Sequence, residues 1–511
     1  MLSIFFMILI FLASIFASLG FIHIFQLNSY RHVRFLRWAK ENKAKFLPYV
    51  LVLVLTLIFS LVNNVIGFPF VVIVSVIIAF LSMKKKAKKP LVYTKRVQRL
   101  LVTISILELF LALSSLIFKA DPLLSAVGFG FTPLIVLLAD VINKPIEKSI
   151  NNYYINDAKK ILKSAKGKLK VIGITGSYGK TSVKFYLTSL LSSEFNVLCT
   201  PESFNTPLGV VRTVRSSLSA MHDIFVCEMG AKNVGDIKEI CDIVSPDHGV
   251  ITSVGPQHLE TFKTLDNVKK TKFELAEEIE GNLFLNGDDE NITAYNKNPN
   301  AIYYGFSEKC DYRAEIISVS MHGTEFKITK KDGTSCEYST KLIGTLNVLN
   351  IVGAVAVSNT LGIPLESLKP QVRKLSVVPH RLELINRGNV SIIDDAYNSN
   401  PSGAKAALET LSLFDGMKIL VTPGMVELGE KQDECNYNFG VQASSVCDFV
   451  AVVGKKPPQQ SILRGLKDSG LSEDKIFSAD NLNEAITKVY SLSSDKRKII
   501  LLENDLPDNY L

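Results

Sequence analysis

The sequence predicts an α/β protein whose two soluble domains follow an N-terminal bundle of about five transmembrane helices. Residues 1–150 are dominated by long apolar stretches. From about Lys168 onward, short β-branched runs alternate with helical patterns, which is typical of βαβ units around a parallel sheet. A Gly-rich turn ending in Gly179-Lys180-Thr181 joins a predicted strand to a predicted helix, as in loops that hold phosphate.

The apolar region has four stretches, at 3–26, 47–83, 100–118 and 122–142. The second is long enough for two passes, with a break near 63–69, so the region predicts about five helices of near-spanning length. A cleaved signal peptide would explain only the first stretch.

Charge predicts the orientation of these helices. Residues 1–150 contain 17 basic and 5 acidic residues, and the basic ones gather in loops 27–46 and 84–99. The connections near 63–67 and 119–121 are short and nearly uncharged. Because positive loops stay in the cytoplasm, we expect the N-terminus outside and everything after residue 142 inside.

The net charge of +8 therefore comes from the membrane-like part, since the rest of the chain is slightly acidic. This distribution argues against nucleic acid as a partner, because a nucleic-acid binder carries its positive charge on a soluble face. The basic loops need no role beyond topology, although contact with anionic lipid is allowed.

A single acidic residue, Glu108, lies inside the apolar stretch 100–118. Ionisable side chains within a membrane often mark a functional position. Two plainer explanations stay open, that Glu108 lies near an interface or is paired within the bundle. Seven scattered cysteines without close pairing favour reduced thiols in a cytosolic domain over disulfides or a zinc site.

The soluble part divides by its strand patterns. We expect a transmembrane region over 1–145, a connecting helix over 146–167, a central ATP-binding domain over 168–375 and a C-terminal α/β domain over 376–511. Within the central domain, the segment 301–342 is rich in predicted antiparallel strands.

The chemistry starts at the predicted phosphate loop, whose backbone N–H groups and following helix N-terminus form an anion cradle. Lys180 can reach the β- and γ-phosphates, and the Thr181 hydroxyl can bind Mg²⁺. Ile174 stands where the usual pattern has Gly, so only the short form of the motif matches.

Three further residues suggest more than ATP hydrolysis, which needs little besides the loop, a Mg²⁺-binding acid and a placed water. Glu228 ends a predicted strand in "VCEMGA", His258 lies in "GPQHLETF", and Lys272 lies in "KKTKFELAEE". Each has a structural alternative: His258 as a hydrogen-bonded structural histidine, and Lys272 as a surface lysine or an ion-pair partner.

These motifs resemble the ATP-dependent Mur ligases of peptidoglycan synthesis. The match comprises "TGSYGKTS", "EMGA", "HLE" and the following lysine, then "PHRLELI" (379–385) and "IIDDAYNSNPSGAKAALETL" (392–411), all in family order. The last run and "GMVELGE" (424–430) are similar to the branch that adds D-alanyl-D-alanine to UDP-N-acetylmuramoyl-tripeptide. The resemblance covers about residues 165–500 and implies a P-loop central domain and a Rossmann-like C-terminal domain.

The resemblance implies which residues bind ATP. The loop would contribute Gly176, Ser177, Gly179, Lys180, Thr181 and Ser182. From the C-terminal side, Arg381 would reach a phosphate and Asp395 the ribose. The surroundings of the nucleoside would be Tyr397, Asn398 and Asn400. As an alternative, Asp394 and Asp395 merely end a strand.

The resemblance also implies two Mg²⁺ sites and a substrate contact. Thr181 and Glu228 would hold the first ion, and His258 and a carbamylated Lys272 the second. Lys180, His258 and Lys272 would be the catalytic residues. Asn205 and Thr206 lie where members contact the carboxylate-donating substrate.

The implied reaction is amide synthesis. ATP phosphorylates an acceptor carboxylate, an amine attacks the acyl phosphate, and phosphate leaves. The expected partners are a peptidoglycan precursor or another envelope acceptor, and an amino acid or dipeptide amine, by default D-alanyl-D-alanine. We also expect the lipid bilayer as a partner, and contact with membrane-bound cell-wall enzymes.

The sequence departs from the family in three places. Members begin with a domain that binds the UDP-sugar. The interval between residues 142 and 168 is too short for such a domain, so we expect the membrane region in its place. It would present a lipid-linked precursor or another envelope polymer, or only localise a conventional enzyme. Leu346 stands where members usually carry His, and "KIILLENDLPDNYL" lacks a Lys-Gly-Ser-Arg stretch, so acceptor binding is expected to differ.

Two other function classes stay open. One is an ATP-driven transporter or membrane regulator with a ligase-derived nucleotide domain, although five passes are few for a transport path. The other is a structural anchor with a decayed site, which the complete set of nucleotide motifs disfavours.

Overall fold

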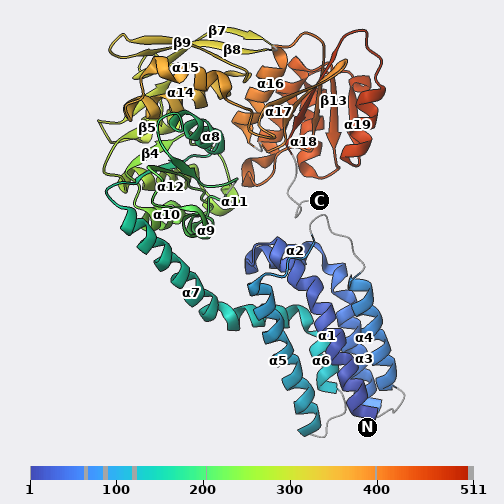
Figure 1. Cartoon of the computed structure of the whole chain (residues 1–511). Coiled ribbons are helices and arrows are strands. Elements are labelled where there is room, and N and C mark those ends of the chain that lie inside the picture. Colours follow the sequence, from blue (N-terminus) through green and yellow to red (C-terminus); the bar gives the residue numbers. More distant parts are fainter. Residues whose placement is uncertain are drawn as a thin grey trace. The chain divides into compact units, whose positions relative to one another are not determined.

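The computed structural model describes residues 2–62, 67–83, 90–117, 123–202, 204–320, 322–397 and 400–504 (Figure 1). The chain divides into two compact units, one within residues 1–153 and one within residues 154–506. Each unit is built around its own buried apolar clusters.

The first unit is helical, as its uninterrupted Leu, Ile, Val and Phe runs predict. Its helices are α1 (Leu2–Leu27), α2 (His32–Glu41), η1 (Lys43–Lys45), α3 (Leu47–Val62), α4 (Gly67–Met83), α5 (Lys95–Ile117), α6 (Leu123–Gly130) and α7 (Thr132–Ala165), which also contains the division between the units. Helix α1 packs against α4, α5 and α6, and α3 packs against α4 and α6.

Two helical segments, Ile4–Leu27 and Lys95–Ser114, are long and apolar enough to cross a membrane. The apolar segments of α3 and α4, Leu47–Leu61 and Gly67–Ser82, fall short of this length. The last apolar stretch is divided between α6, which ends at Gly130, and α7. The expected bundle of about five spanning helices is therefore found only in part among the described residues. Helices α3 and α4 lie on either side of the predicted break but fall short of a spanning length, and the last stretch is divided.

Polar residues lie inside the first unit. Glu108 is buried between helices, and its Oε1 has no hydrogen-bond partner among the described residues. Gly128 of α6 lies so near that a Cβ there would approach Glu108 Oε2 to 2.6 Å. The carboxyl therefore packs directly against the backbone of α6 within the bundle and does not lie at its edge.

Two arginines expected in the basic loop 84–99 belong instead to α5. Arg96 Nη2 donates to Asp140 Oδ1 at 2.9 Å, and Arg99 donates through Nε and Nη2 to the two oxygens of Glu147, at 2.6 and 2.8 Å. Both acids lie on α7. These pairs join α5 to α7, while the loop lysines 84–89 and the connections 63–66 and 118–122 lie outside the described residues.

The second unit begins with a nine-stranded sheet in the order β2-β3-β1-β4-β5-β6-β7-β8-β9. Its strands are β1 (Lys170–Thr175), β2 (Val197–Cys199), β3 (Ile224–Glu228), β4 (His248–Ile251), β5 (Leu283–Asn286), β6 (Ile302–Gly305), β7 (Tyr312–Ser320), β8 (Gly323–Lys330) and β9 (Ser335–Thr340). The pairs from β2 to β7 are parallel, and β7, β8 and β9 are antiparallel, in the segment where the sequence predicts antiparallel strands.

Helices cover both faces of the parallel part of this sheet, which explains why β1, β3 and β5 are buried on both sides, whereas burial alternates along β9. They are α8 (Lys180–Leu191), α9 (Pro207–Ser217), α10 (Asp236–Val244), α11 (Leu259–Phe262), α12 (Leu265–Glu277), α13 (Glu290–Tyr295), α14 (Thr345–Thr360) and α15 (Leu365–Lys374). One apolar cluster contains residues of α8 and α14, and a separate one contains residues of α9, α10 and α12. The carboxyl ends of the parallel strands stay open for a site.

A six-stranded sheet follows in the order β10-β11-β15-β12-β13-β14, and only its edge pair β10–β11 is antiparallel. Its elements are β10 (Glu383–Arg387), β11 (Val390–Asp395), α16 (Pro401–Ser412), β12 (Met417–Thr422), η2 (Gly429–Lys431), α17 (Gln432–Val446), β13 (Phe449–Val453), α18 (Pro457–Asp468), η3 (Glu473–Lys475), β14 (Ile476–Ala479), α19 (Leu482–Ser491) and β15 (Lys498–Glu503). This second α/β sheet agrees with the fold class that the sequence predicts.

All seven cysteines are free thiols. Five are buried, whereas Cys199 in β2 and Cys435 in α17 are half-buried.

Candidate functional site

The Gly-rich turn after β1 has a backbone that only glycine can follow. Gly176 has φ +150°, and a Cβ there would lie 2.1 Å from Thr252 Oγ1. Gly179 has φ +79° and caps the N-terminus of α8. The N–H of Tyr178 donates to Ser253 Oγ at 2.7 Å, so the residues after β4 brace the loop. The arrangement is an open turn of N–H groups at a helix N-terminus, which suits phosphate.

Lys180 begins α8 and folds back over this loop. Its Nζ donates to the carbonyl oxygens of Gly176 and Ser177, at 2.7 and 3.2 Å. Burial lowers the pKa of the Lys180 ammonium to about 8, with Glu228 opposing this effect and Arg381 adding to it. A cation that bonds only to neutral carbonyls is available to an incoming phosphate.

Glu228 lies at the carboxyl end of β3, directly beside the loop. Thr181 Oγ1 donates to its Oε1 at 3.2 Å, and Asn205 Nδ2 donates to the same oxygen at 2.9 Å. The neighbouring predicted residue, Thr206, instead caps α9 by accepting from the Gly209 N–H at 3.3 Å. Three of the predicted residues, Thr181, Asn205 and Glu228, therefore meet at the Glu228 carboxylate, whereas Thr206 does not contact it.

A lysine that the sequence analysis passed over completes this group. Lys184 Nζ lies 3.1 Å from Glu228 Oε2, and both side chains are buried. It also donates to the carbonyl oxygen of Glu202. Burial alone would raise the pKa of Glu228, but Lys184 and then Lys180 hold it below its ordinary value. The only sequence signal for Lys184 was its place one helical turn after Lys180.

Lys272 is buried in α12 and makes no ion pair or hydrogen bond with the described residues. Burial, and then the nearby Lys180, lower the pKa of its ammonium well below the ordinary value. Lys272 is therefore not the surface lysine or ion-pair partner of the structural alternatives.

His258 begins α11 with a left-handed backbone, φ 50°. Its Nδ1 lies 2.5 Å from Oε2 of Glu427, in the loop after β12 of the second sheet. Burial lowers the pKa of the imidazole, and the hydrogen bond with Glu427 opposes this shift. Lys272 is close enough to His258 to contribute to the same shift. His258 and Glu427 are 169 positions apart in the sequence, so no local sequence pattern predicts their contact.

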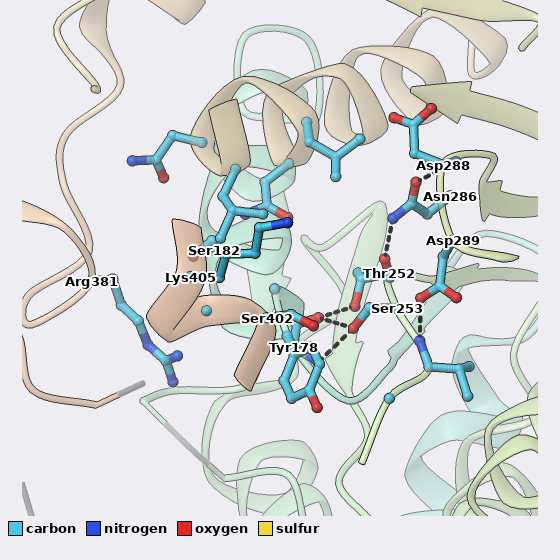
Figure 2. A pocket seen from close by; sticks show the side chains of 18 of the residues that line it. Tyr178, Ser182, Thr252, Ser253, Asn286, Asp288, Asp289, Arg381, Ser402 and Lys405 are labelled. Carbon is cyan, nitrogen blue, oxygen red and sulfur yellow. Dashed lines mark hydrogen bonds between the residues drawn. The ribbon is translucent and has the colours of Figure 1, made fainter. Parts of the chain in front are cut away.

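A cavity of about 690 Å³ adjoins the loop. In Figure 2, Arg381 lies at one end of this cavity and Asp288 and Asp289 at the other, with Tyr178 between them. The sequence analysis missed one group of its lining residues, which begins at the last residue of β5: Asn286, Asp288, Asp289 and Asn291. A polar run directly after a buried strand was the signal for them, because the carboxyl edge of a parallel sheet is where ligands bind. Leu346 also lines the cavity.

The predicted C-terminal residues line two pockets, and Arg381 lines both of them. Arg381 and Asp395 line the large cavity, together with Ser402 and Lys405 of α16. Tyr397 and Asn400 line a smaller pocket of about 120 Å³ beside Lys180. The Asn400 side chain also caps α16 by accepting from the Gly403 N–H at 2.7 Å. Asn398 lies outside the described residues.

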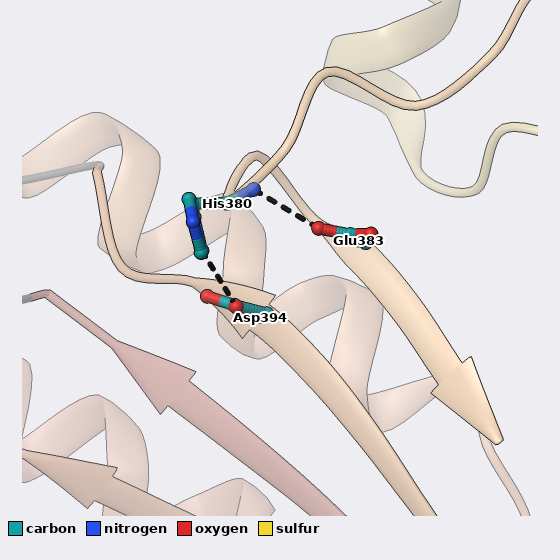
Figure 3. Close-up of side chains that lie close together, drawn as sticks. All are labelled: His380, Glu383 and Asp394. Atoms are coloured by element: carbon teal, nitrogen blue, oxygen red, sulfur yellow. Dashed lines mark hydrogen bonds and ion pairs between the residues drawn. The ribbon is translucent and has the colours of Figure 1, made fainter.

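His380, Glu383 and Asp394 form a cluster next to Arg381 (Figure 3). The His380 Nδ1 lies 2.8 Å from Asp394 Oδ2, and the backbone N–H of His380 donates to Glu383 Oε2 at 3.2 Å. Glu383 and Asp394 lie directly opposite each other on β10 and β11. The imidazole therefore lies beside two facing carboxylates and fixes the turn that carries Arg381.

The residues at the loop fit Mg²⁺. A hydroxyl and a carboxylate oxygen, from Thr181 and Glu228, are the hard ligands that this ion prefers. At the second position, His258 has one ring nitrogen that is not bonded to Glu427, while the ammonium form of Lys272 offers no ligand atom. As an N-carboxylate Lys272 would offer the oxygen atoms that Mg²⁺ prefers, and its burial without an acidic hydrogen-bond partner among the described residues suits that modification.

Comparisons with known proteins decide the family. The model of the Mur ligase middle domain matches residues 174–358, and that of the Mur ligase glutamate ligase domain matches residues 380–503. A UDP-N-acetylmuramoyl-tripeptide–D-alanyl-D-alanine ligase of Buchnera aphidicola is 31% identical over 334 residues, covering 64% of this chain and 68% of that protein. The chain belongs to the Mur ligase family.

Solved structures of Mur ligases agree with this assignment. MurF from Acinetobacter baumannii superimposes with a TM-score of 0.64 and 25% identity, covering 70% of this chain and 77% of that one. MurF from Thermotoga maritima, solved in complex with ADP, gives 0.62 and 26%, covering 70% and 80%. This MurF-like Mur ligase is an ATP-dependent enzyme that joins a carboxylate to an amine in peptidoglycan precursor synthesis.

Proposed function

We propose that this Mur ligase is anchored in the cytoplasmic membrane and joins the carboxylate of a peptidoglycan precursor to D-alanyl-D-alanine. The observation that carries this proposal is the pocket of about 120 Å³ that Lys180 and Thr181 line from one domain and Arg381 from the other, with Glu228 bonded to Thr181. The amine is taken from the name of the relatives, which are D-alanyl-D-alanine ligases.

In this proposal the loop and Lys180 hold the γ-phosphate while the acceptor carboxylate attacks its phosphorus. ADP leaves, and an acyl phosphate remains. The amine nitrogen then attacks the carbonyl carbon, phosphate leaves, and the nitrogen loses its proton to give the amide. Lys180 and Arg381 lower the repulsion between carboxylate and phosphate, since both are cations in a largely buried site.

Two bound Mg²⁺ ions would supply further charge neutralisation around the phosphates. Thr181 and Glu228 would hold one ion, and His258 and carbamylated Lys272 the other. Asn205 fixes the orientation of Glu228 by its hydrogen bond. Asp395 would bind the ribose, with Tyr397 and the neighbouring asparagines around the nucleoside.

The membrane part of the proposal rests on the surface of the first unit. Large apolar side chains are exposed all along α1, α3, α4 and α5, including Phe5, Phe16, Leu57, Phe80 and Phe110. An apolar surface of this extent requires lipid or a partner to cover it. We propose five passes, with an anchor over 1–145, a connecting helix over 146–167, and ATP-binding and C-terminal domains over 168–375 and 376–511 in the cytoplasm.

The acceptor is either UDP-linked or lipid-linked. A helical bundle in the bilayer can bring the enzyme to a lipid-linked precursor. The test uses the full chain in nanodiscs with ATP and D-alanyl-D-alanine. UDP-linked and undecaprenyl-linked acceptors are supplied side by side, and products are identified by mass spectrometry. We expect one ADP per amide product, and no product from Lys180→Ala. Turnover of the UDP-linked acceptor alone would reject the lipid-linked version, and turnover of neither would reject the ligase proposal.

The buried Glu108 favours one alternative, an ATP-driven membrane transporter or regulator. Such a protein would release ADP without acceptor and amine, whereas a ligase requires both. Measuring ADP release while omitting each substrate in turn separates the two functions.

A further inference from the structure

Glu427 belongs to the C-terminal sheet domain, yet its carboxylate bonds to His258 of the ATP-binding domain. The two polar atoms, Glu427 Oε2 and His258 Nδ1, are 2.5 Å apart, and each side chain is about one-fifth exposed. The pair is thus largely shielded from water, where a charged hydrogen bond is stronger than at an open surface.

Both residues adopt a strained backbone to reach each other. His258 has φ 50° and Glu427 has φ 64°, and neither is a glycine. Such conformations cost about 1–3 kcal/mol each and persist where the surroundings hold them. The Glu427 loop is held by buried Asn436, which accepts from the Met425 N–H at 2.8 Å and donates to the Met425 carbonyl at 3.0 Å.

The carboxylate takes one specific nitrogen of the imidazole. Because Nδ1 bonds to Glu427, the ring leaves Nε2 for a ligand, and Nε2 has no hydrogen bond to the described residues. Histidines that bind metals commonly donate their other ring N–H to a carboxylate, which fixes the tautomer and the ring orientation. The His258–Glu427 pair has this arrangement, with its two halves on different domains.

We propose that Glu427 is a positioning residue for the metal site of His258, and that this site is complete only when the C-terminal domain is docked. The inference rests on the proposed role of His258 as a metal ligand. Glu427 orients the ligand through Nδ1 and does not touch the ion.

Domain docking and metal binding are then linked. Outer carboxylates of this kind change metal affinity by about 10–100-fold. By reciprocity, the ion favours the docked state by the same factor. The second ion would therefore be held firmly only in the closed site, which protects a water-sensitive acyl phosphate.

The test measures Mn²⁺ binding by electron paramagnetic resonance, using the full chain in detergent with a non-hydrolysable ATP analogue. We expect two classes of bound Mn²⁺. Glu427→Ala should weaken one class by about 10–100-fold. Glu427→Gln should stay within about threefold of wild type, because its amide oxygen accepts the same hydrogen bond. Glu430→Ala, which replaces an exposed acid three positions later in η2, is the matched control and should change nothing.

Equal losses in Glu427→Ala and Glu427→Gln would mean direct ligation and overturn the inference, as would unchanged binding in both. His258→Ala separates this failure from that of the proposed metal site. If His258→Ala removes one Mn²⁺ class and Glu427→Ala does not, only the inference fails. If His258→Ala leaves both classes intact, the proposed site fails as well.

Docking has its own readout, the rate of trypsin cleavage between the domains near 374–381. Mn²⁺ should slow this cleavage in wild type and not in Glu427→Ala. Equal protection in both proteins would overturn the link between docking and metal. Melting temperatures confirm that each variant is folded.

Discussion

Lys184 Nζ lies 3.1 Å from Glu228 Oε2, and both side chains are shut off from solvent. Removing one partner of a buried ion pair leaves an uncompensated charge and costs about 3–5 kcal/mol. Lys184→Met should therefore lower the melting temperature by roughly 6–20 °C. The double variant Lys184→Met/Glu228→Gln should melt above the single one. The exposed pair Lys238–Glu278 is the control, and Lys238→Met should melt like wild type. A Lys184→Met protein as stable as wild type would contradict the prediction.

Lys272 should be active only after reaction with CO₂, because burial and the nearby Lys180 lower the pKa of its ammonium and so favour the amine form that attacks CO₂. We expect Lys272→Ala to lose about 10²-fold or more in amide formation, as for loss of one electrostatic catalytic group. Acetate or formate should restore part of that rate, since a small carboxylate can enter the vacated space. Lys269→Ala, on the same helix, should keep full activity without added carboxylate. Absence of rescue at any carboxylate concentration would argue against carbamylation.

Glu503 should make the stability of the C-terminal domain depend on pH. Burial, and then neighbouring Asp395, raise the pKa of its carboxyl well above the ordinary value. The folded state thus keeps a proton that the unfolded chain releases above about pH 4.5, so stability falls as pH rises toward the folded pKa.

Glu503→Gln removes this titration and can still accept from Thr422 Oγ1, which lies 3.2 Å from Glu503 Oε2. It should match wild type at pH 4 and melt several degrees higher at pH 8, about 2–4 °C for each kcal/mol gained. Exposed Glu430→Gln should follow the wild-type curve at both pH values. A constant difference across pH would show that packing, not protonation, is responsible.

Gly128 should be coupled energetically to Glu108 within the helical unit. A Cβ at Gly128 would meet Glu108 Oε2 at 2.6 Å and Leu111 Cδ1 at 2.9 Å. Gly128→Ala should cost about 1–3 kcal/mol through overpacking, measured by thermal unfolding in detergent. Glu108→Ala should recover part of this cost, with a coupling of about 0.5–3 kcal/mol in a double-mutant cycle. Gly20→Ala has open space around its Cβ and should not destabilise the protein.

Features that depend on neighbouring residues could be predicted from the sequence. The phosphate loop is local, since an apolar strand, two glycines and a lysine lie within ten positions. The alternation of strands and helices likewise predicted the two α/β sheets. Glu228 was identifiable because it ends a buried strand beside that loop.

Contacts between segments that are distant in the sequence could not be predicted from local patterns. Lys184 looks like any helix lysine, and only the placement of β3 shows that it faces Glu228. Glu427 meets His258 through the docking of two domains. Hydropathy located the apolar helices and the break between α3 and α4, but it did not show that the last stretch is divided between α6 and α7.

The half-buried thiols of Cys199 and Cys435 lie in different α/β domains, whereas the other five cysteines are buried. A maleimide dye therefore meets one partly accessible thiol in each domain of the native chain, and it should label Cys435 more slowly because burial raises the pKa of that thiol. A donor dye on one of these cysteines and an acceptor dye on the other would report the distance between the two domains across the catalytic cleft. Opening and closing during turnover would be readable by energy transfer in single molecules, without any engineered cysteine.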